Sequence, residues 1–156
     1  MLSLRVSKPR PDVSSVSYRM SPIMLATLEV PFDPAAAALA VDTAVESGQP
    51  LIVANVVEIP LGPMCLLMGY GDLEPPEAEA VGLRAPAELA HSLGVQVERL
   101  RVKSPHPLDA LLELVAERRP GLLVFGPDRL RLRPRAYRKA AKALRDRAAC
   151  LLWLSE

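Results

Sequence analysis

Short apolar runs alternate along the chain with longer segments of helical pattern, and this alternation constrains the fold more than any other feature. Runs of this kind, uncharged or nearly so over four to eight residues, suit strands buried on both faces of a parallel sheet. The predicted strands lie at 23–30, 51–57, 95–103, 121–126 and 150–154. The third alternates apolar and charged residues from Leu100 onward, as a strand near a sheet edge does.

The segments between these runs carry helix signals. Asp33 is a good N-cap, Pro34 suits the first helical position, and Gly48 suits the left-handed end of a helix over 35–47. Further helices are predicted at 77–93, with a break or kink at Pro86, at 107–118 and at 136–148. The order β-α-β-α-β-α-β-α-β predicts an α/β fold with a doubly wound parallel sheet in three layers.

The 156 residues suit a single α/β domain, predicted over 22–156. Residues 1–21, rich in Ser, Pro and Arg and without periodicity, predict a flexible arm. The connection 58–76 is rich in Pro and Gly yet strongly apolar. It is expected to pack on its own domain or, alternatively, to meet a partner.

Charge is balanced overall at +1 but unevenly distributed. Residues 20–117 hold fourteen acidic and four basic side chains, whereas residues 118–147 hold eleven basic and two acidic ones. The basic end could steer a small anionic ligand, or it could balance the acidic middle.

The sequence holds two cysteines, Cys65 and Cys150, at no zinc or redox spacing, which favours free thiols in a reducing compartment. No signal peptide or membrane-length apolar run is visible, so we expect a cytoplasmic protein. His91 and His106 have no carboxylate or cysteine companions at metal-ligand spacing, so structural or surface roles are favoured and no metal is expected.

Over residues 23–154 the chain resembles the universal stress protein family. The resemblance rests on the element order, an apolar first strand ending in an acidic residue, a long stretch after the second strand, the letters LLVFG before the last helix and the closing ACLLWL. It implies strand order 3-2-1-4-5, a cytoplasmic homodimer paired through Leu151–Leu154, and ATP or AMP binding in one branch of the family.

The ATP-binding branch has the pattern G-x2-G-x9-G-[S/T] after its fourth strand. Here Gly126 matches the first glycine, Arg129 stands at the second, and the final pair falls near Lys139. The family's ribose-binding aspartate corresponds to Glu29, or to Asp33 if the turn is shifted. A bound nucleotide would also contact the backbone of the second predicted strand, near Asn55 and Val56.

Arginines alternate with other residues in the turn after Gly126, and Arg129 and Arg131 are the candidates for holding an anion. Guanidinium groups can hold a phosphate through paired hydrogen bonds without glycine. The alternative is a solvated turn whose leucines pack inward.

The sequence contains no GxSxG, HExxH or P-loop motif and no evident nucleophile–base pair, which favours a protein that is not an enzyme. We therefore expect a non-catalytic stress-protein-like domain that senses a ligand or binds a protein and is not a strong ATP binder. One alternative is an adenine-nucleotide binder with its phosphates near Gly126. Another, nucleic-acid association through the basic last helix, is disfavoured because that helix offers only Tyr137 for base stacking.

Overall fold

The computed structural model describes residues 20–59 and 77–155, and for 77–81 only the backbone. The predicted arm and the predicted apolar connection, which includes Cys65, lie almost wholly outside these residues.

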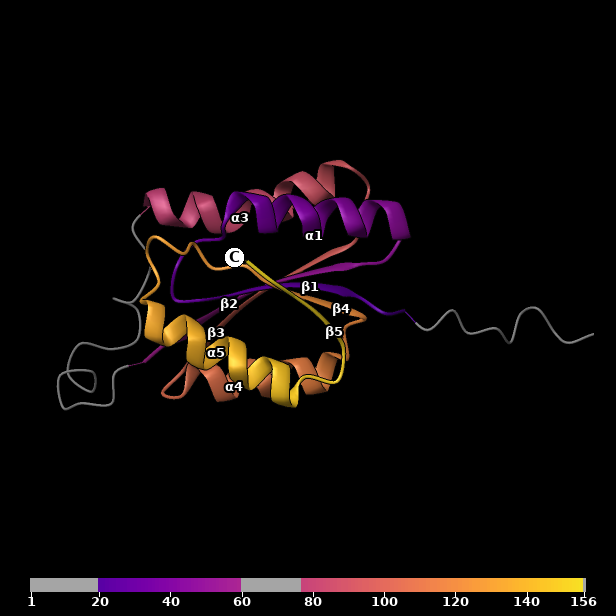
Figure 1. Ribbon diagram of the computed structural model, residues 1–156. Coiled ribbons are helices and arrows are strands. Elements are labelled where there is room, and N and C mark those ends of the chain that lie inside the picture. Colours follow the sequence, from indigo (N-terminus) through magenta and orange to yellow (C-terminus); the bar gives the residue numbers. More distant parts are fainter. Residues whose placement is uncertain (1–19, 60–76, 156) are drawn as a thin grey trace, which may run out of the picture.

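The described chain alternates strands and helices as predicted (Figure 1). The strands are β1 (Ile23–Leu28), β2 (Leu51–Glu58), β3 (Val97–Ser104), β4 (Leu122–Phe125) and β5 (Leu151–Leu154). The helices are α1 (Pro34–Ser47), α3 (Glu77–Ser92), α4 (Pro107–Arg118) and α5 (Pro134–Arg147). Each element lies within a few residues of its predicted place.

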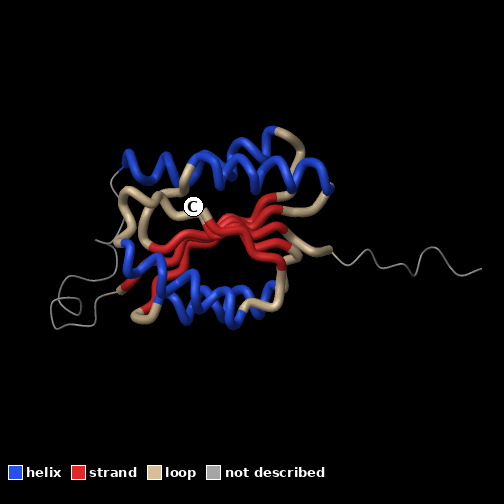
Figure 2. Tube along the Cα trace, in the orientation of Figure 1, coloured by secondary structure: helices blue, strands red, loops and turns tan. Residues whose placement is uncertain are grey.

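All strand pairs are parallel, and the sheet order is β3-β2-β1-β4-β5, which confirms the predicted α/β fold. Helices α1 and α3 cover one face of the sheet, and α4 and α5 cover the other (Figures 1 and 2). In a sheet of this kind the strand order reverses beside β1, and ligands bind beyond the carboxyl ends of the strands near that point.

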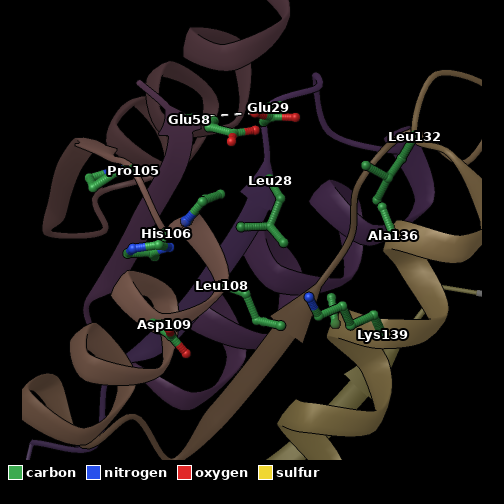
Figure 3. Close-up of a pocket in the computed structure, with 12 residues that line it drawn as sticks. Leu28, Glu29, Glu58, Pro105, His106, Leu108, Asp109, Leu132, Ala136 and Lys139 are labelled. Carbon is green, nitrogen blue, oxygen red and sulfur yellow. Dashed lines mark hydrogen bonds between the residues drawn. The ribbon is translucent and has the colours of Figure 1, made fainter. Parts of the chain in front are cut away.

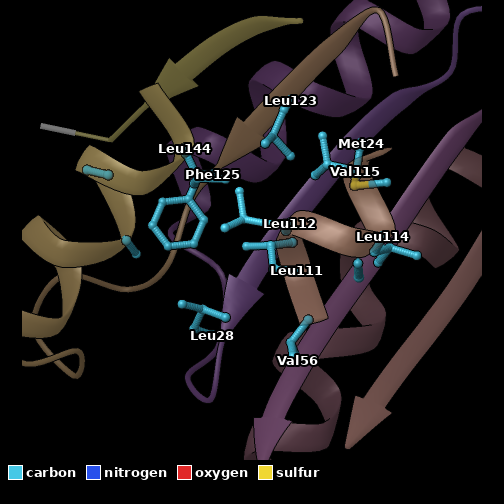
Figure 4. Close-up of a cluster of buried hydrophobic side chains, with 14 of the residues drawn as sticks. Met24, Leu28, Val56, Leu111, Leu112, Leu114, Val115, Leu123, Phe125 and Leu144 are labelled. Atoms are coloured by element: carbon cyan, nitrogen blue, oxygen red, sulfur yellow. The ribbon is translucent and has the colours of Figure 1, made fainter. Parts of the chain in front are cut away.

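The sheet separates two apolar cores. On the α4–α5 face, Phe125, Leu111 and Leu144 are among fully buried side chains (Figure 4). On the α1–α3 face the core is mainly aliphatic with one buried aromatic residue, Phe32, and Leu25 and Val41 are fully buried in it. The central strand β1 is buried along its whole length, as its uncharged sequence predicts.

Two predicted helix signals behave as expected. The Asp33 carboxylate accepts a hydrogen bond from the Ala36 N–H at 3.1 Å and caps α1. Gly48 ends that helix in the left-handed conformation, with φ 66°. Helix α3 runs through Pro86 as one helix, so of the predicted break or kink at this residue the break does not occur.

Candidate functional site

A pocket of about 370 Å³ lies beyond the carboxyl ends of β1 and β2, where α4 and α5 begin (Figure 3). Its apolar floor includes Leu28, Leu108 and Leu132. Its charged or titratable lining residues are Glu29, Glu58, His106, Asp109 and Lys139. An apolar floor with a few polar groups, at this end of a parallel sheet, is the usual form of a small-ligand site.

Two glutamates form one wall of the pocket. The Glu29 carboxylate accepts a hydrogen bond from the Glu58 N–H at 3.2 Å, which places the two residues side by side (Figure 3). The Glu29 backbone is left-handed, with φ 64°, and its N–H donates to the Val56 carbonyl at 2.9 Å. That conformation is rare for a residue other than glycine and often marks a functional turn. Both glutamate side chains are exposed and available to accept hydrogen bonds.

The opposite wall comes from the first turn of α4 and the first two turns of α5. Lys139 extends from α5 toward Leu108 (Figure 3). Neither His106 nor Arg133, the N-cap residues of these helices, caps its helix with a side-chain hydrogen bond. The first-turn N–H groups of both helices are therefore left for solvent or a ligand.

The two helix starts differ in charge. Helix α4 has Asp109 in its first turn, and α5 has no acidic residue there. Because a carboxylate already complements the positive end of α4, the start of α5 beside Lys139 is the better seat for an external anion.

Gly126 does not lie open to this pocket. A Cβ atom placed on it would lie 2.1 Å from the Ala36 Cβ, so α1 covers it. Its N–H donates to the Ala26 carbonyl at 3.0 Å, and its carbonyl accepts from the Asp33 N–H at 2.9 Å. Glycine here permits a close approach of α1 to the end of β4.

Two arginine side chains in the turn after Gly126 contact other residues of the protein. Arg129 donates to the Ser155 carbonyl at 2.9 Å and lies 3.5 Å from the centre of the Tyr137 ring. The Tyr137 hydroxyl donates to the same carbonyl. Arg131 is exposed and lies 3.6 Å from the Asp128 carboxylate. Leu132 packs into the core, whereas Leu130 is 97% exposed, so the turn buries one of its two leucines.

The two candidates on β2 are buried. Val56 lies in the α4–α5 core, and its carbonyl is taken by Glu29. Asn55 is 6% exposed, and its Oδ1 has no hydrogen-bond partner among the described residues. Strand alternation directs Asn55 to the α1–α3 face, away from the pocket.

Of the predicted site residues, the structure brings Glu29 and Lys139 into one pocket and places Asp33 against Gly126. Sequence reasoning did not name Glu58 or Asp109 as site residues and gave His106 only a structural or surface role. Glu58 is the last residue of β2, and His106 and Asp109 lie at the start of α4. That position, at the carboxyl end of a parallel sheet, was the available signal.

A second pocket, of about 340 Å³, lies at the other end of the sheet, where α4 and α5 end. Cys150 lines it, and burial raises the pKa of the Cys150 thiol, an effect partly offset by a hydrogen bond from the Leu123 backbone. Within the described residues no three potential ligand side chains are grouped to hold a metal ion. No described helix is long and apolar enough to cross a bilayer.

No protein-family model matches the sequence, and the search of curated proteins gives no match. Solved structures do match. The universal stress protein UspA from Lactobacillus plantarum aligns with a TM-score of 0.64 at 15% identity, over 88% of this chain and 99% of its own. A universal stress protein from Burkholderia pseudomallei aligns with a TM-score of 0.60 at 17% identity, over 88% and 97%.

A universal stress protein solved in complex with cAMP aligns with a TM-score of 0.56 at 21% identity, over 85% of this chain and 96% of its own. These identities are low, but the alignments run through nearly all of both chains. With its parallel sheet in the order β3-β2-β1-β4-β5, the chain has the fold of the universal stress proteins.

Proposed function

We propose that this protein is a non-catalytic ligand-binding domain whose pocket beyond β1 and β2 takes a nucleoside monophosphate. The proposal rests on the two walls of the pocket. The carboxylates of Glu29 and Glu58 form one wall, and Lys139 and the uncapped start of α5 form the other. Ribose hydroxyls would donate to the carboxylates, and the phosphate would lie at the start of α5.

A monophosphate fits better than a triphosphate. The pocket volume of about 370 Å³ is near the lower end of the range for small-ligand sites. The turn that would have to hold further phosphates is occupied, because Ala36 covers Gly126 and Arg129 binds the Ser155 carbonyl. The match to a protein solved with cAMP supports a ligand with a single phosphate.

Binding without catalysis is proposed because the described pocket lining contains no serine, threonine, cysteine or tyrosine side chain. Its titratable groups are suited to hold hydroxyl and phosphate groups in place. In this proposal the protein acts as a sensor whose bound and free states differ in stability or in their partners.

Calorimetric titration with AMP, adenosine and 2′,3′-dideoxy-AMP tests the proposal. The wild type should bind AMP more tightly than adenosine, and Lys139→Ala should remove most of that difference, a loss of about tenfold in AMP affinity. Lys142→Ala, an exposed lysine on the same helix outside the pocket, is the matched control and should bind AMP normally.

Glu29→Gln separates the two walls. The variant should have a lower affinity for AMP and an unchanged, weaker affinity for 2′,3′-dideoxy-AMP, because only the contact with the ribose hydroxyls is altered. Absence of AMP binding to the wild type, or normal AMP affinity in Lys139→Ala, would refute the proposal.

We also propose that the protein forms a homodimer through β5. This strand is an edge of the sheet, and Leu151 on it is 73% exposed. An exposed apolar edge strand needs cover. Sedimentation analysis should show a wild-type dimer and a monomeric Leu151→Lys variant; a monomeric wild type at micromolar concentration would contradict this arrangement.

A further inference from the structure

The second pocket, at the amino ends of β4 and β5, is distinct from the nucleotide site in both position and lining. Buried apolar side chains of α4, Leu112 and Val115, lie at its base, and Pro120 and Cys150 lie beside them. Pro120 belongs to the segment that leads from α4 into β4, and Cys150 belongs to the segment that leads from α5 into β5; both segments can be followed in Figure 1. The cavity is thus apolar in its depth and lies at the opposite end of the sheet from Glu29 and Lys139.

The charged groups of this pocket are all of one sign. Arg119 and Arg147 are its only charged lining residues in the described part of the chain. Arg119 makes no ion pair there, and Arg147 lies 3.8 Å from Asp109, with both side chains more than half exposed. An ion pair as exposed as this one contributes little to stability, so a carboxylate ligand can replace Asp109 at little cost.

The ends of α4 and α5 reduce this positive charge without cancelling it. Each helix end carries roughly half a negative charge, whereas each guanidinium carries a full positive one. Once the Asp109 carboxylate beside Arg147 is also counted, these charges roughly balance. A ligand carboxylate that takes the place of Asp109 keeps that balance, so the ligand that matches the pocket has one anionic group and an apolar body that lies over the apolar base.

We propose that this pocket binds an amphiphilic carboxylate, a medium-chain fatty acid or a compound of that chemistry, with the carboxylate between Arg119 and Arg147 and the chain over Leu112 and Val115. Guanidinium groups pair with carboxylates through two parallel hydrogen bonds, which favours a carboxylic acid over a neutral lipid. The ligand would cover Cys150 as it fills the cavity.

Cys150 provides the readout. In a Cys65→Ser background it is the single thiol, and its rate of modification by N-ethylmaleimide reports whether the cavity is filled. Decanoate, used below its micelle concentration, should slow the modification several-fold, whereas 1-decanol and decyltrimethylammonium should protect much less. Calorimetry with decanoate should give the same affinity as the protection assay.

The Arg119→Ala/Arg147→Ala double variant should lose most of the decanoate protection. Arg138→Ala/Arg145→Ala, with two exposed arginines of α5 outside the pocket, is the matched control and should keep it. Circular dichroism establishes that both double variants are folded. Equal protection by decanoate and 1-decanol, no protection by decanoate, or unchanged protection in the Arg119/Arg147 variant would overturn the proposal.

Discussion

The turn after β4 and the pocket beyond β1 lie at the same end of the sheet, but they use their polar groups differently. In the turn, Arg129 donates to the Ser155 carbonyl, and Gly126 lies under α1. In the pocket, Glu29 and Lys139 face a cavity, and the first turn of α5 has no side-chain cap. A motif position thus predicts where a loop lies, whereas the partners of its side chains decide whether the loop can bind a ligand.

The largest expected effect is at Gly126. Gly126→Ala would force a Cβ against Ala36 Cβ and should lower the free energy of unfolding by about 3 kcal/mol, measured by urea denaturation. Adding Ala36→Gly should remove the clash and restore part of the stability. The recovery should be incomplete, because glycine within α1 lowers the free energy of unfolding by about 1 kcal/mol. Gly82→Ala, whose Cβ would have its nearest neighbour at 3.5 Å, is the control. A Gly126→Ala protein as stable as the wild type would disprove the close packing.

Arg129→Ala tests whether the turn is structural. It removes the bond to the Ser155 carbonyl and the contact with the Tyr137 ring, and should lower the free energy of unfolding by about 1.5 kcal/mol. AMP affinity should remain within twofold of wild type, the reverse of Lys139→Ala. If the variant kept its stability and lost AMP binding, the result would show that the anion binds at the turn and not at α5.

The uncapped start of α5 gives a sharper test. Arg133 has φ −60° and ψ 135°, almost the conformation of Asp33, which caps α1 with φ −63° and ψ 130°. Arg133→Asp should therefore cap α5 and raise the free energy of unfolding by about 1 kcal/mol. The same variant should also lower the affinity for AMP roughly tenfold, because the new carboxylate would compete with the phosphate for the start of α5. Higher stability with unchanged AMP affinity would show that the phosphate does not lie at α5.

The smallest effect concerns Cys150. Because burial raises its pKa, the folded protein holds the thiol proton more tightly than the unfolded chain does. The free energy of unfolding should therefore fall as pH rises through the ordinary cysteine range. Cys150→Ala should remove this contribution, so the difference between wild type and variant is constant at neutral pH and changes only in alkali. A difference that does not vary with pH would contradict the raised pKa.

The order of the elements could be predicted from the sequence because the uncharged runs of β1 and β2 have few alternatives to burial in a parallel sheet. The pocket could be predicted only in part. Glu29 and Lys139 were found through the family pattern, whereas His106 and Glu58 match no motif and enter the pocket only because parallel strands bring their ends together. The internal use of Arg129 depends on Ser155, which is 26 residues away in the chain, and no local pattern reports such a contact.

The bonds to the Ser155 carbonyl also bear on the order of folding. Arg129 and Tyr137 both reach this carbonyl, and Tyr137 can do so only from a formed α5. The residue directly after β5 therefore has both hydrogen bonds only when α5 and the turn before it are in place. During synthesis the edge of β4 stays unpaired until residues 151–154 emerge, which leaves an apolar strand edge exposed for that interval.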